Sequence, residues 1–394
     1  MENTNGLPRC TGCGACVQAC PVSGAISLAA DGEGFYRPVT TDLCIHCGAC
    51  RKICPELSLG AARSEPYETF WAARHRDPAV VRQSSSGGAF TALAQAVLAQ
   101  GGVVYGVVWQ GAQAVYRRAR TLAEVEAMRG SKYIQTAPCP RLDEAFVQDA
   151  AAGIPVLYTG LSCKISGMRR LLARRKISAD TVWFVDLVCT GVISPLLWQR
   201  ERERYEQQYG SLVSYNFRDK CTGWQDYSLS VQLQNGTTRH RRRLLTPMGR
   251  YQGTPEAKGL CCDGCQYADV QKRQGDITLA DFWNKQVLPP EWQDDKGISL
   301  LAATPKGEKL LLQAQQWLVR CQTTQAAVQN SAHISGAQQR ESFWNDFSRN
   351  PYEDFRKRHG ELPLRQKLLL GIIRPLLLRT KVLDWLRSRR GNKA

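Results

Sequence analysis

The chain has 394 residues, of which 43% are hydrophobic, and a formal net charge of +17. This length predicts two or three domains, and the composition supplies enough apolar side chains for a large folded core. No apolar run is long enough to span a membrane and no cleavable apolar N-terminus is evident, so the 16 cysteines are expected to stay reduced in the cytoplasm. The basic balance suits an acidic protein or an anionic coenzyme, and we find no nucleic-acid-binding motif.

The first stretch contains two cysteine runs of identical spacing, C-x2-C-x2-C-x3-C-P. They comprise Cys10, Cys13, Cys16 and Cys20 before Pro21, and Cys44, Cys47, Cys50 and Cys54 before Pro55. In the bacterial ferredoxin arrangement, the fourth cysteine of each run serves the other cluster. We therefore predict one 4Fe-4S cluster on Cys10, Cys13, Cys16 and Cys54, and a second on Cys44, Cys47, Cys50 and Cys20. Zinc or a disulfide knot is the alternative, and the doubled spacing with proline disfavours both.

Residues 1–60 are thus expected to form a ferredoxin-like domain, followed by a linker at 61–68. From 69 to about 330, strand-like and helix-like patterns alternate, which predicts a fold class of α+β and α/β. The predicted strands are 69–74, 102–109, 115–121, 155–158, 181–188, 214–217, 228–234, 237–241, 276–282 and 298–303. The predicted helices are 89–100, 122–128, 142–151, 165–175, 196–209 and 306–319. Asn235-Gly236 is typical of a tight hairpin turn.

Residues 331–394 predict a separate basic helical tail. The stretch 342–359 is aromatic and charged, whereas 362–390 is basic and leucine-rich and is interrupted by Pro375. A helical pair packed on the protein's own body is the favoured interpretation. Docking on a partner, or peripheral contact with an anionic inner membrane surface, is the alternative.

A loop of serines and glycines, Ser84 to Gly88, lies between a predicted strand and the predicted helix 89–100. Hydroxyls, free amides and a helix N-terminus at this point predict an anion site that suits a diphosphate. The loop is neither a Walker motif nor a complete dinucleotide fingerprint, and a Ser/Gly loop is more often only a loop.

Eight motifs in chain order resemble the coenzyme F420 hydrogenase/dehydrogenase beta-subunit family: SSSGGAFTALA, GGVVYGVVW, MRGSKYIQ, VLYTGLSCKISGMRRLL, DLVCTGVISPLLW, FRDKCTGW, CDGCQY and DITLADFW. The resemblance runs from about Thr69 to Trp317. It implies a mixed α/β flavin-binding domain of the beta-subunit type, carrying FAD and iron-sulfur clusters. The family includes flavoprotein subunits of deazaflavin-dependent hydrogenases and dehydrogenases.

Carried over residue by residue, the resemblance assigns flavin contacts to Ser85, Ser86, Gly87, Gly88, Lys132, Tyr133, Thr159 and Gly160. Lys132 is the predicted catalytic residue, because a cation near the ring stabilises the anionic reduced flavin. A surface lysine without any such contact is the alternative.

Four further cysteines predict a third 4Fe-4S cluster. Cys163 and Cys189 each follow a predicted strand, and Cys262 and Cys265 form a C-x2-C pair. Strand ends converge in α/β folds, and each of the four matches a family cysteine. Ser162, Thr190 and Asn284 replace the family's usual proline, histidine and glycine, which bears on coenzyme specificity more than on the metal. Zinc or simple burial remains open, and Cys139, Cys221, Cys261 and Cys321 are interpreted as free thiols.

Together these features predict a cytoplasmic oxidoreductase that passes electrons between FAD and its clusters, coupled to ferredoxin or a deazaflavin coenzyme. The alternative is an electron-transfer adaptor docked on a separate catalytic partner subunit. Two arginine-rich groups, within 169–176 and 239–243, are expected to steer an acidic redox carrier.

Overall fold

A computed structural model describes residues 9–57, 65–324 and 338–370. Its first part is a small unit of two short helices, α1 (Ala15–Ala19) and α2 (Ala49–Ile53), and a two-stranded antiparallel sheet. The strands are β1 (Ile26–Ala30) and β2 (Tyr36–Thr40). Each helix begins after a glycine in the left-handed region, Gly14 with φ 82° and Gly48 with φ 72°, which glycine adopts without strain. The two cysteine runs therefore fold into the same turn-and-helix geometry.

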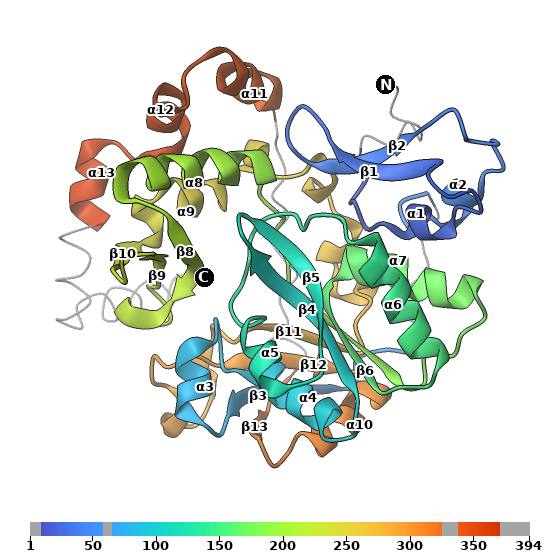
Figure 1. Ribbon diagram of the computed structural model, residues 1–394. Coiled ribbons are helices and arrows are strands. Elements are labelled where there is room, and N and C mark those ends of the chain that lie inside the picture. Colours follow the sequence, from blue (N-terminus) through green and yellow to red (C-terminus); the bar gives the residue numbers. More distant parts are fainter. Residues whose placement is uncertain (1–8, 58–64, 325–337, 371–394) are drawn as a thin grey trace.

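The centre of the molecule is an eight-stranded mixed sheet in the order β13-β3-β12-β11-β7-β6-β4-β5 (Figure 1). The strands are β3 (Thr69–His75), β4 (Val103–Gln110), β5 (Gln113–Ala119), β6 (Val156–Leu161), β7 (Val182–Leu187), β11 (Ile277–Asp281), β12 (Ser299–Ala303) and β13 (Leu318–Gln322). Among them β4, β6, β7 and β11 are parallel, so their carboxyl ends meet at one edge. Such an edge is where α/β folds place their ligands.

Helices cover both faces of this sheet. Alternate strand residues point to opposite sides, so Val104, Leu157 and Val185 pack on one face, and Tyr105 and Tyr158 on the other. The first face is covered by α4 (Ala89–Leu98), α5 (Leu122–Glu126) and α10 (Pro305–Gln313). The second is covered by α6 (Pro140–Ala151) and α7 (Ser162–Arg174). The small N-terminal unit lies against α6 and α7 (Figure 1).

A second antiparallel sheet lies beside the main body, in the order β10-β9-β8. Its strands are β8 (Leu212–Asp219), β9 (Ser228–Leu233) and β10 (Thr238–Arg242), and the predicted hairpin turn contains Gly236 with φ 82°. The long helix before it is α8 (Pro195–Tyr209). Short 3-10 segments are η1 (Lys220–Thr222), η2 (Arg243–Leu245), η3 (Pro255–Ala257), η4 (Leu260–Cys262), η5 (Gln266–Ala268), η6 (Val270–Lys272), η7 (Lys285–Val287) and η8 (Pro290–Trp292).

The described part of the tail packs on the body, as the favoured interpretation expected. It comprises α11 (Arg340–Arg349), α12 (Tyr352–Phe355), the π-helical turn η10 (Arg356–Gly360) and α13 (Leu364–Leu368). Phe343, Trp344 and Phe355 are buried in one cluster with Met248 and Tyr251, the latter two from α9 (Pro247–Tyr251). Residues 371–394, on which the membrane interpretation mainly rested, lie outside the described residues. Within the described part of the chain, no helix is both long and apolar enough to cross a bilayer.

Two local predictions were wrong. The helix predicted over 306–319 ends at Gln313, and residues 318–322 pair with β3 as an edge strand instead. A helix before the Ser/Gly loop was also missed, α3 (Pro78–Gln83), so this loop joins two helices rather than a strand and a helix. The start signal of α3 was present, because the Asp77 side chain accepts a hydrogen bond from Ala79 N and proline occupies the first helical position.

Candidate iron-sulfur and flavin sites

The inner half of the ferredoxin-like unit gathers four cysteines from both runs. Burial, followed by the thiolate of Cys13 and more weakly by that of Cys54, raises the pKa of Cys10 to about 12. Burial is also the main cause of the raised pKa of Cys16, followed by the thiolates of Cys13, Cys10 and Cys54. Cys54 ends the second run, so its presence in this group is what crossed ligation requires.

The outer half gathers the other set. Burial raises the pKa of Cys50, and Cys44 and Cys20 are the thiolates that raise it further. Cys20 ends the first run but lies with the cysteines of the second. Cys47, in the loop before α2, is exposed, which places this half of the unit toward solvent.

Helix α7 connects the inner set to the main body. A Cβ atom at Gly167 would lie 2.9 Å from Cys13 Sγ and 3.2 Å from Ala15 Cβ, so the absence of a side chain lets the cysteine loop pack directly on the helix. Lys164 Nζ donates to Cys13 O at 2.9 Å and forms an ion pair with Asp143 at 2.7 Å. These contacts hold the inner set at a defined position on α7.

The four cysteines predicted to form the third site do come together. Burial raises the pKa of Cys163 well above its ordinary value, followed by the thiolates of Cys265, Cys189 and Cys262, and then by Cys13 of the ferredoxin-like unit. Cys163 stands in the first turn of α7, four residues before Gly167, and residues at this spacing share one helix face. The third set is therefore the neighbour of the inner ferredoxin set.

Backbone and charge around the third set suit anionic sulfur ligands. Gly191 has φ 107°, and a Cβ atom there would lie 3.4 Å from Cys262 Sγ. Gly191 N donates to Cys189 Sγ at 3.3 Å. Lys258 is buried and donates from Nζ to Thr190 O at 2.7 Å; burial lowers its pKa to about 8, against the opposing effect of the Cys189 and Cys262 thiolates. Its ammonium offsets part of the negative charge of the site.

A fifth thiol accompanies this set. Cys261, interpreted from the sequence as a free thiol, has its Sγ 4.0 Å from Cys262 Sγ. Its hydrogen bond with Cys262 and its burial raise its pKa, while Arg37 lowers it. Arg37 also donates to Cys10 O at 3.4 Å, so it lies between the inner ferredoxin set and the third set. The adjacent cysteine pair in the sequence was the signal that could have indicated this proximity.

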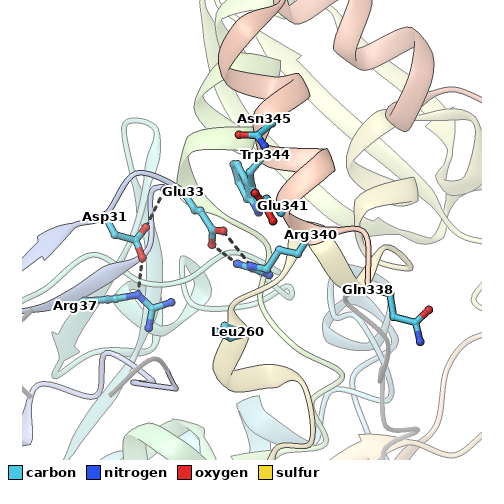
Figure 2. Close-up of a pocket in the computed structure, with 9 residues that line it drawn as sticks. All are labelled: Asp31, Glu33, Arg37, Leu260, Gln338, Arg340, Glu341, Trp344 and Asn345. Atoms are coloured by element: carbon cyan, nitrogen blue, oxygen red, sulfur yellow. Dashed lines mark hydrogen bonds and ion pairs between the residues drawn. The ribbon is translucent and has the colours of Figure 1, made fainter. Parts of the chain in front are cut away.

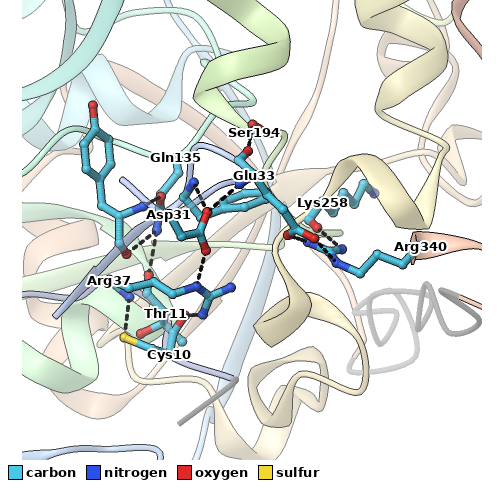
Figure 3. Close-up of polar contacts among 12 residues, drawn as sticks. Cys10, Thr11, Asp31, Glu33, Arg37, Gln135, Ser194, Lys258 and Arg340 are labelled. Carbon is cyan, nitrogen blue, oxygen red and sulfur yellow. Dashed lines mark hydrogen bonds and ion pairs between the residues drawn. The ribbon is translucent and has the colours of Figure 1, made fainter. Parts of the chain in front are cut away.

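A polar network joins the ferredoxin-like unit to the body near these cysteines (Figure 3). Gln135 Nε2 donates to Thr11 O at 3.3 Å, and Gln135 Oε1 accepts from Tyr36 N at 2.7 Å. Glu33 forms an ion pair with Arg340 of α11, whose guanidinium also donates to Lys258 O at 2.7 Å. The described part of the tail is thereby fixed to the ferredoxin-like unit and to the segment that precedes Cys262.

The described residues line two cavities near this junction. The first has a volume of about 680 Å³, and the Glu33–Arg340 pair lies within its lining (Figure 2). Its lining residues are Asp31, Glu33, Arg37, Leu260, Gln338, Arg340, Glu341, Trp344 and Asn345. The second, of about 580 Å³, lies between the ferredoxin-like unit and α8 and includes Tyr36, Gln135 and Trp198. The Ser/Gly loop lines neither cavity.

The structure brings two predicted flavin residues together around a buried arginine. Arg218 Nη2 donates to Ser85 O at 3.1 Å, and Arg218 Nη1 lies 3.4 Å from Tyr133 Oη. Ser131 N donates to Ser85 Oγ at 2.9 Å. Arg218 is held by a buried ion pair of 2.8 Å with Asp281, at the carboxyl end of β11. Arg218 could not be selected from the sequence, because its partners lie far away along the chain.

An exposed aromatic ring adjoins this group. Trp283 follows β11, is 45% exposed, and stacks on the buried Trp224 with ring centroids 4.8 Å apart and an interplanar angle of 11°. The guanidinium carbon of Arg218 lies 5.6 Å from the centroid of Trp283. Leu187, at the carboxyl end of the neighbouring β7, is also exposed. An exposed aromatic ring thus lies beside the arginine that contacts Ser85 and Tyr133.

The rest of the Ser/Gly loop is occupied by internal contacts. Ser86 Oγ donates to Ile298 O at 2.7 Å, and Gly87 N donates to Ser299 Oγ at 3.0 Å. A Cβ atom at Gly87 would lie 2.6 Å from Ser299 N, so packing against the sheet already requires glycine there. Gly88 precedes α4 with φ 83°. The Gly87 amide is thus engaged by Ser299, and its contact with a flavin stays a prediction.

Lys132 has a different environment from the one expected of a catalytic residue. Its Nζ donates to the carbonyls of residues 127–130 at 3.0 to 3.2 Å, at the end of α5. Burial lowers its pKa to about 7, while the carbonyl acceptors favour its charged form. These contacts give Lys132 a positioning role in the loop that carries Ser131 and Tyr133, and its contact with a flavin stays a prediction.

Thr159 and Gly160 lie inside β6. Thr159 Oγ1 donates to Tyr105 O at 2.9 Å on the neighbouring strand. Gly160 faces the hydroxyl of Tyr116 on β5. The described contacts do not bring these two residues to Ser85 or Tyr133.

Most of the arginines expected to steer a redox carrier are already engaged. Arg169 pairs with the buried Asp276 at 2.7 Å, and Arg175 pairs with Glu144 at 3.1 Å. In the second group Arg242 pairs with Asp226, and Arg239 lies 4.0 Å from the Tyr209 ring centroid. Because these arginines already make internal contacts, fewer of them remain to attract an acidic redox carrier.

The contact between α7 and Cys13 yields a first prediction. Gly167→Leu should push the Cys13 loop away from the helix, because even a Cβ atom there lies in contact with Sγ. We expect the electron paramagnetic resonance signals of the predicted inner and third clusters to lose their mutual broadening in the reduced protein. Leu172→Met conserves volume at a buried position on the same helix. This control should keep the mutual broadening. Unaltered coupling in Gly167→Leu would contradict the contact.

Comparison with protein families gives three matches. Residues 9–57 match a 4Fe-4S dicluster domain, residues 70–142 match the coenzyme F420 hydrogenase/dehydrogenase beta subunit N-term, and residues 155–324 match the C terminus of the same subunit. The chain is thus an iron-sulfur protein of an oxidoreductase type. It belongs to the coenzyme F420 hydrogenase/dehydrogenase beta-subunit family, and the resemblance of the eight motifs is confirmed. The predicted mixed α/β fold behind a ferredoxin-like domain is also confirmed.

Thirteen chains of solved structures match this one. One belongs to the F420-reducing [NiFe] hydrogenase complex of Methanosarcina barkeri, in a xenon-derivatized form. It is 20% identical, with a TM-score of 0.46, and the match covers 65% of this chain and 82% of that chain. No curated protein sequence matches the chain.

Proposed function

We propose that this chain is a flavin- and iron-sulfur-dependent oxidoreductase that passes electrons between FAD and 4Fe-4S clusters, coupled to ferredoxin or a deazaflavin coenzyme. Bound FAD would supply two-electron exchange with a hydride carrier and one-electron exchange with clusters. The proposal divides the chain into a ferredoxin-like domain at 1–60, an oxidoreductase domain at 69–330 and a basic tail at 331–394.

The observation that carries the proposal is the position of α7. This one helix contributes Cys163 to the third cysteine set and, one turn later, contacts Cys13 of the inner ferredoxin set. Such an arrangement fits a continuous series of redox sites better than it fits separate structural metals. In the proposed series Cys163, Cys189, Cys262 and Cys265 would hold a third 4Fe-4S cluster. Their four thiols match cubane ligation, and Lys258 provides nearby positive charge.

The proposed flavin site lies at the carboxyl edge of the sheet. Ser85, Tyr133 and Trp283 surround Arg218, whose fixed guanidinium would favour an anionic reduced ring. Trp283 offers an exposed face for stacking. The predicted contacts of other parts of the cofactor remain Ser86, Gly87, Gly88, Lys132, Thr159 and Gly160.

We predict that Trp283→Ala weakens FAD binding by roughly tenfold or more, because stacking of a flat ring on an aromatic side chain contributes about 1–3 kcal/mol. Fluorescence titration with FAD measures this change, in protein that contains its clusters and from which the flavin has been removed. Val287→Ala, at an exposed position in the same segment, is the control and should bind FAD like the wild type. Equal affinity in the two variants would move the flavin away from Trp283.

One surface feature bears on the second candidate, an electron-transfer adaptor. Leu43 and Ile45 flank Cys44 in the outer ferredoxin set and are 58% and 64% exposed. Large exposed apolar side chains beside a redox site suit docking of another protein, either a carrier or a catalytic subunit. An oxidoreductase that meets its own substrate also needs such a surface for its carrier, so this feature fits both candidates.

Anaerobic mixing experiments separate these candidates. The reconstituted chain is mixed with reduced deazaflavin, reduced ferredoxin and NADH in separate runs, and flavin absorbance is followed. Bleaching by a deazaflavin or by ferredoxin, followed by turnover of a small acceptor without another subunit, supports the enzyme. Bleaching that leads to turnover only after a second protein is added supports the adaptor, and no bleaching by any donor contradicts both.

A further inference from the structure

Three side chains with metal-binding atoms converge outside the cysteine sets already described. Asp219 ends β8, Cys221 lies on η1, and His240 lies on the edge strand β10. His240 Nδ1 is 3.1 Å from Asp219 Oδ2 and 3.4 Å from Cys221 Sγ. All three ligand atoms lie within 4.8 Å of one another. This group has no place in the proposed electron path.

The geometry does not suit a nucleophilic triad. A catalytic relay needs the cysteine on one imidazole nitrogen and the carboxylate on the other, so that the ring can pass a proton between them. Here Asp219 and Cys221 both approach Nδ1 of His240. Three donors that face one point are arranged for a cation placed among them.

The spacing agrees with tetrahedral zinc. Zinc binds imidazole nitrogen at about 2.0–2.1 Å and thiolate sulfur at about 2.3 Å, which places these two ligand atoms about 3.6 Å apart in a tetrahedron. The nitrogen and a carboxylate oxygen would be about 3.4 Å apart by the same geometry. The separations of 3.4 Å for sulfur and 3.1 Å for oxygen are therefore within a few tenths of an ångström of those required.

The local backbone and charges also fit. Asp219 Oδ1 accepts from Cys221 N at 2.8 Å, which fixes the carboxylate and leaves Oδ2 toward the histidine. Among the nearby arginines, Arg242 pairs with Asp226, and Arg239 packs on the ring of Tyr209. Neither arginine pairs with Asp219, whose carboxylate accepts from Ser230 and from Cys221 N and lies against His240.

We propose that Asp219, Cys221 and His240 bind one zinc ion, which clips the edge strand β10 to the end of β8. The thiol of Cys221 loses its proton to solvent on binding, so the thiolate and carboxylate balance the two charges of the ion. Cys221 and His240 are exposed, so the fourth position is open to water. This site is independent of the iron-sulfur and flavin proposals.

Cysteine alkylation in the full-length cluster-loaded protein tests this site. Iodoacetamide labelling of Cys221, followed by mass spectrometry, should slow by about tenfold or more when zinc sulfate is present, because a metal-bound thiolate is a poor nucleophile. His240→Ala should lose this protection, whereas Thr238→Ala, at an exposed position on the same strand, should keep it. Labelling of Cys321, in β13, serves as the internal reference and should not respond to zinc.

Metal analysis of the same samples completes the test. Wild-type protein should retain one zinc per chain after gel filtration with its iron content unchanged, and Cys221→Ser should retain none. Zinc uptake that accompanies iron loss would place the metal at the cluster cysteines and overturn the proposal. Labelling of Cys221 at the same rate with and without zinc, or equal protection in His240→Ala, would overturn it too.

Discussion

Cys163→Ser should lower the iron content from about twelve to about eight atoms per chain, with sulfide falling in parallel. Cys163 is the centre of the third set, since the thiolates of Cys265, Cys189 and Cys262 all raise its pKa. Serine is a poor replacement for a thiolate ligand, so the variant should not hold a cluster at this set. Anaerobic iron and sulfide analysis of the reconstituted variant measures the loss.

Cys139→Ser is the matched control for this prediction. Cys139 precedes α6, and its sulfur lies 3.5 Å from Ala137 O, so the described contacts give it no cluster to hold. This variant should keep about twelve irons. A wild-type plateau near eight irons would remove the third cluster, and zinc found in its place would identify the set as a structural metal site.

The second large effect concerns crossed ligation in the ferredoxin-like domain. Cys54→Ser should destroy the inner cluster, although Cys54 belongs to the second run, because it lies with Cys10, Cys13 and Cys16. Cys20→Ser should destroy the outer cluster for the converse reason. Each variant should lose about four irons, one third of the total.

Magnetic coupling tells the two variants apart. Cys20→Ser should leave the inner and third clusters coupled in the reduced protein, because Cys13 and Cys163 remain in place on either side of α7. Cys54→Ser should abolish that coupling. The opposite pattern would mean that each run ligates its own cluster.

Local sequence was sufficient to predict the parts of the molecule that depend on near neighbours in the chain. The cysteine runs have short fixed spacings, and the left-handed turns at Gly14 and Gly48 repeat with them. Strands such as β7 and β12 were predicted because a strand buried on both faces is a short continuous apolar run. The domains identified by the family matches also contain the short local motifs from which they were predicted.

Features that depend on tertiary contact were not predictable in this way. In the sequence, Gly167 is indistinguishable from any other glycine in a helix, and only the fold places Cys13 against it. The partners of Arg218 likewise come from three distant segments. Residues 318–322 form a strand because β3 offers an open edge, and this outweighs the helical pattern before them.

Residues of the Ser/Gly loop show why a local motif alone does not define a ligand site. A glycine in such a loop can allow either a phosphate or another backbone segment to approach closely. Gly87 allows the close approach of Ser299. A lysine can meet a cofactor or end a helix, and Lys132 binds carbonyls at the end of α5. Ser85 and Tyr133 are the predicted contacts that the structure does bring together, through Arg218.

The number of electrons that one chain accepts tests the central claim most directly. Stepwise anaerobic titration with dithionite, followed by absorbance and electron paramagnetic resonance, should consume about five electrons per chain: one for each of three clusters and two for FAD. A total near two would leave only the dicluster domain redox-active and contradict the account. Totals near three or four would show that the flavin or the third cluster, respectively, is absent.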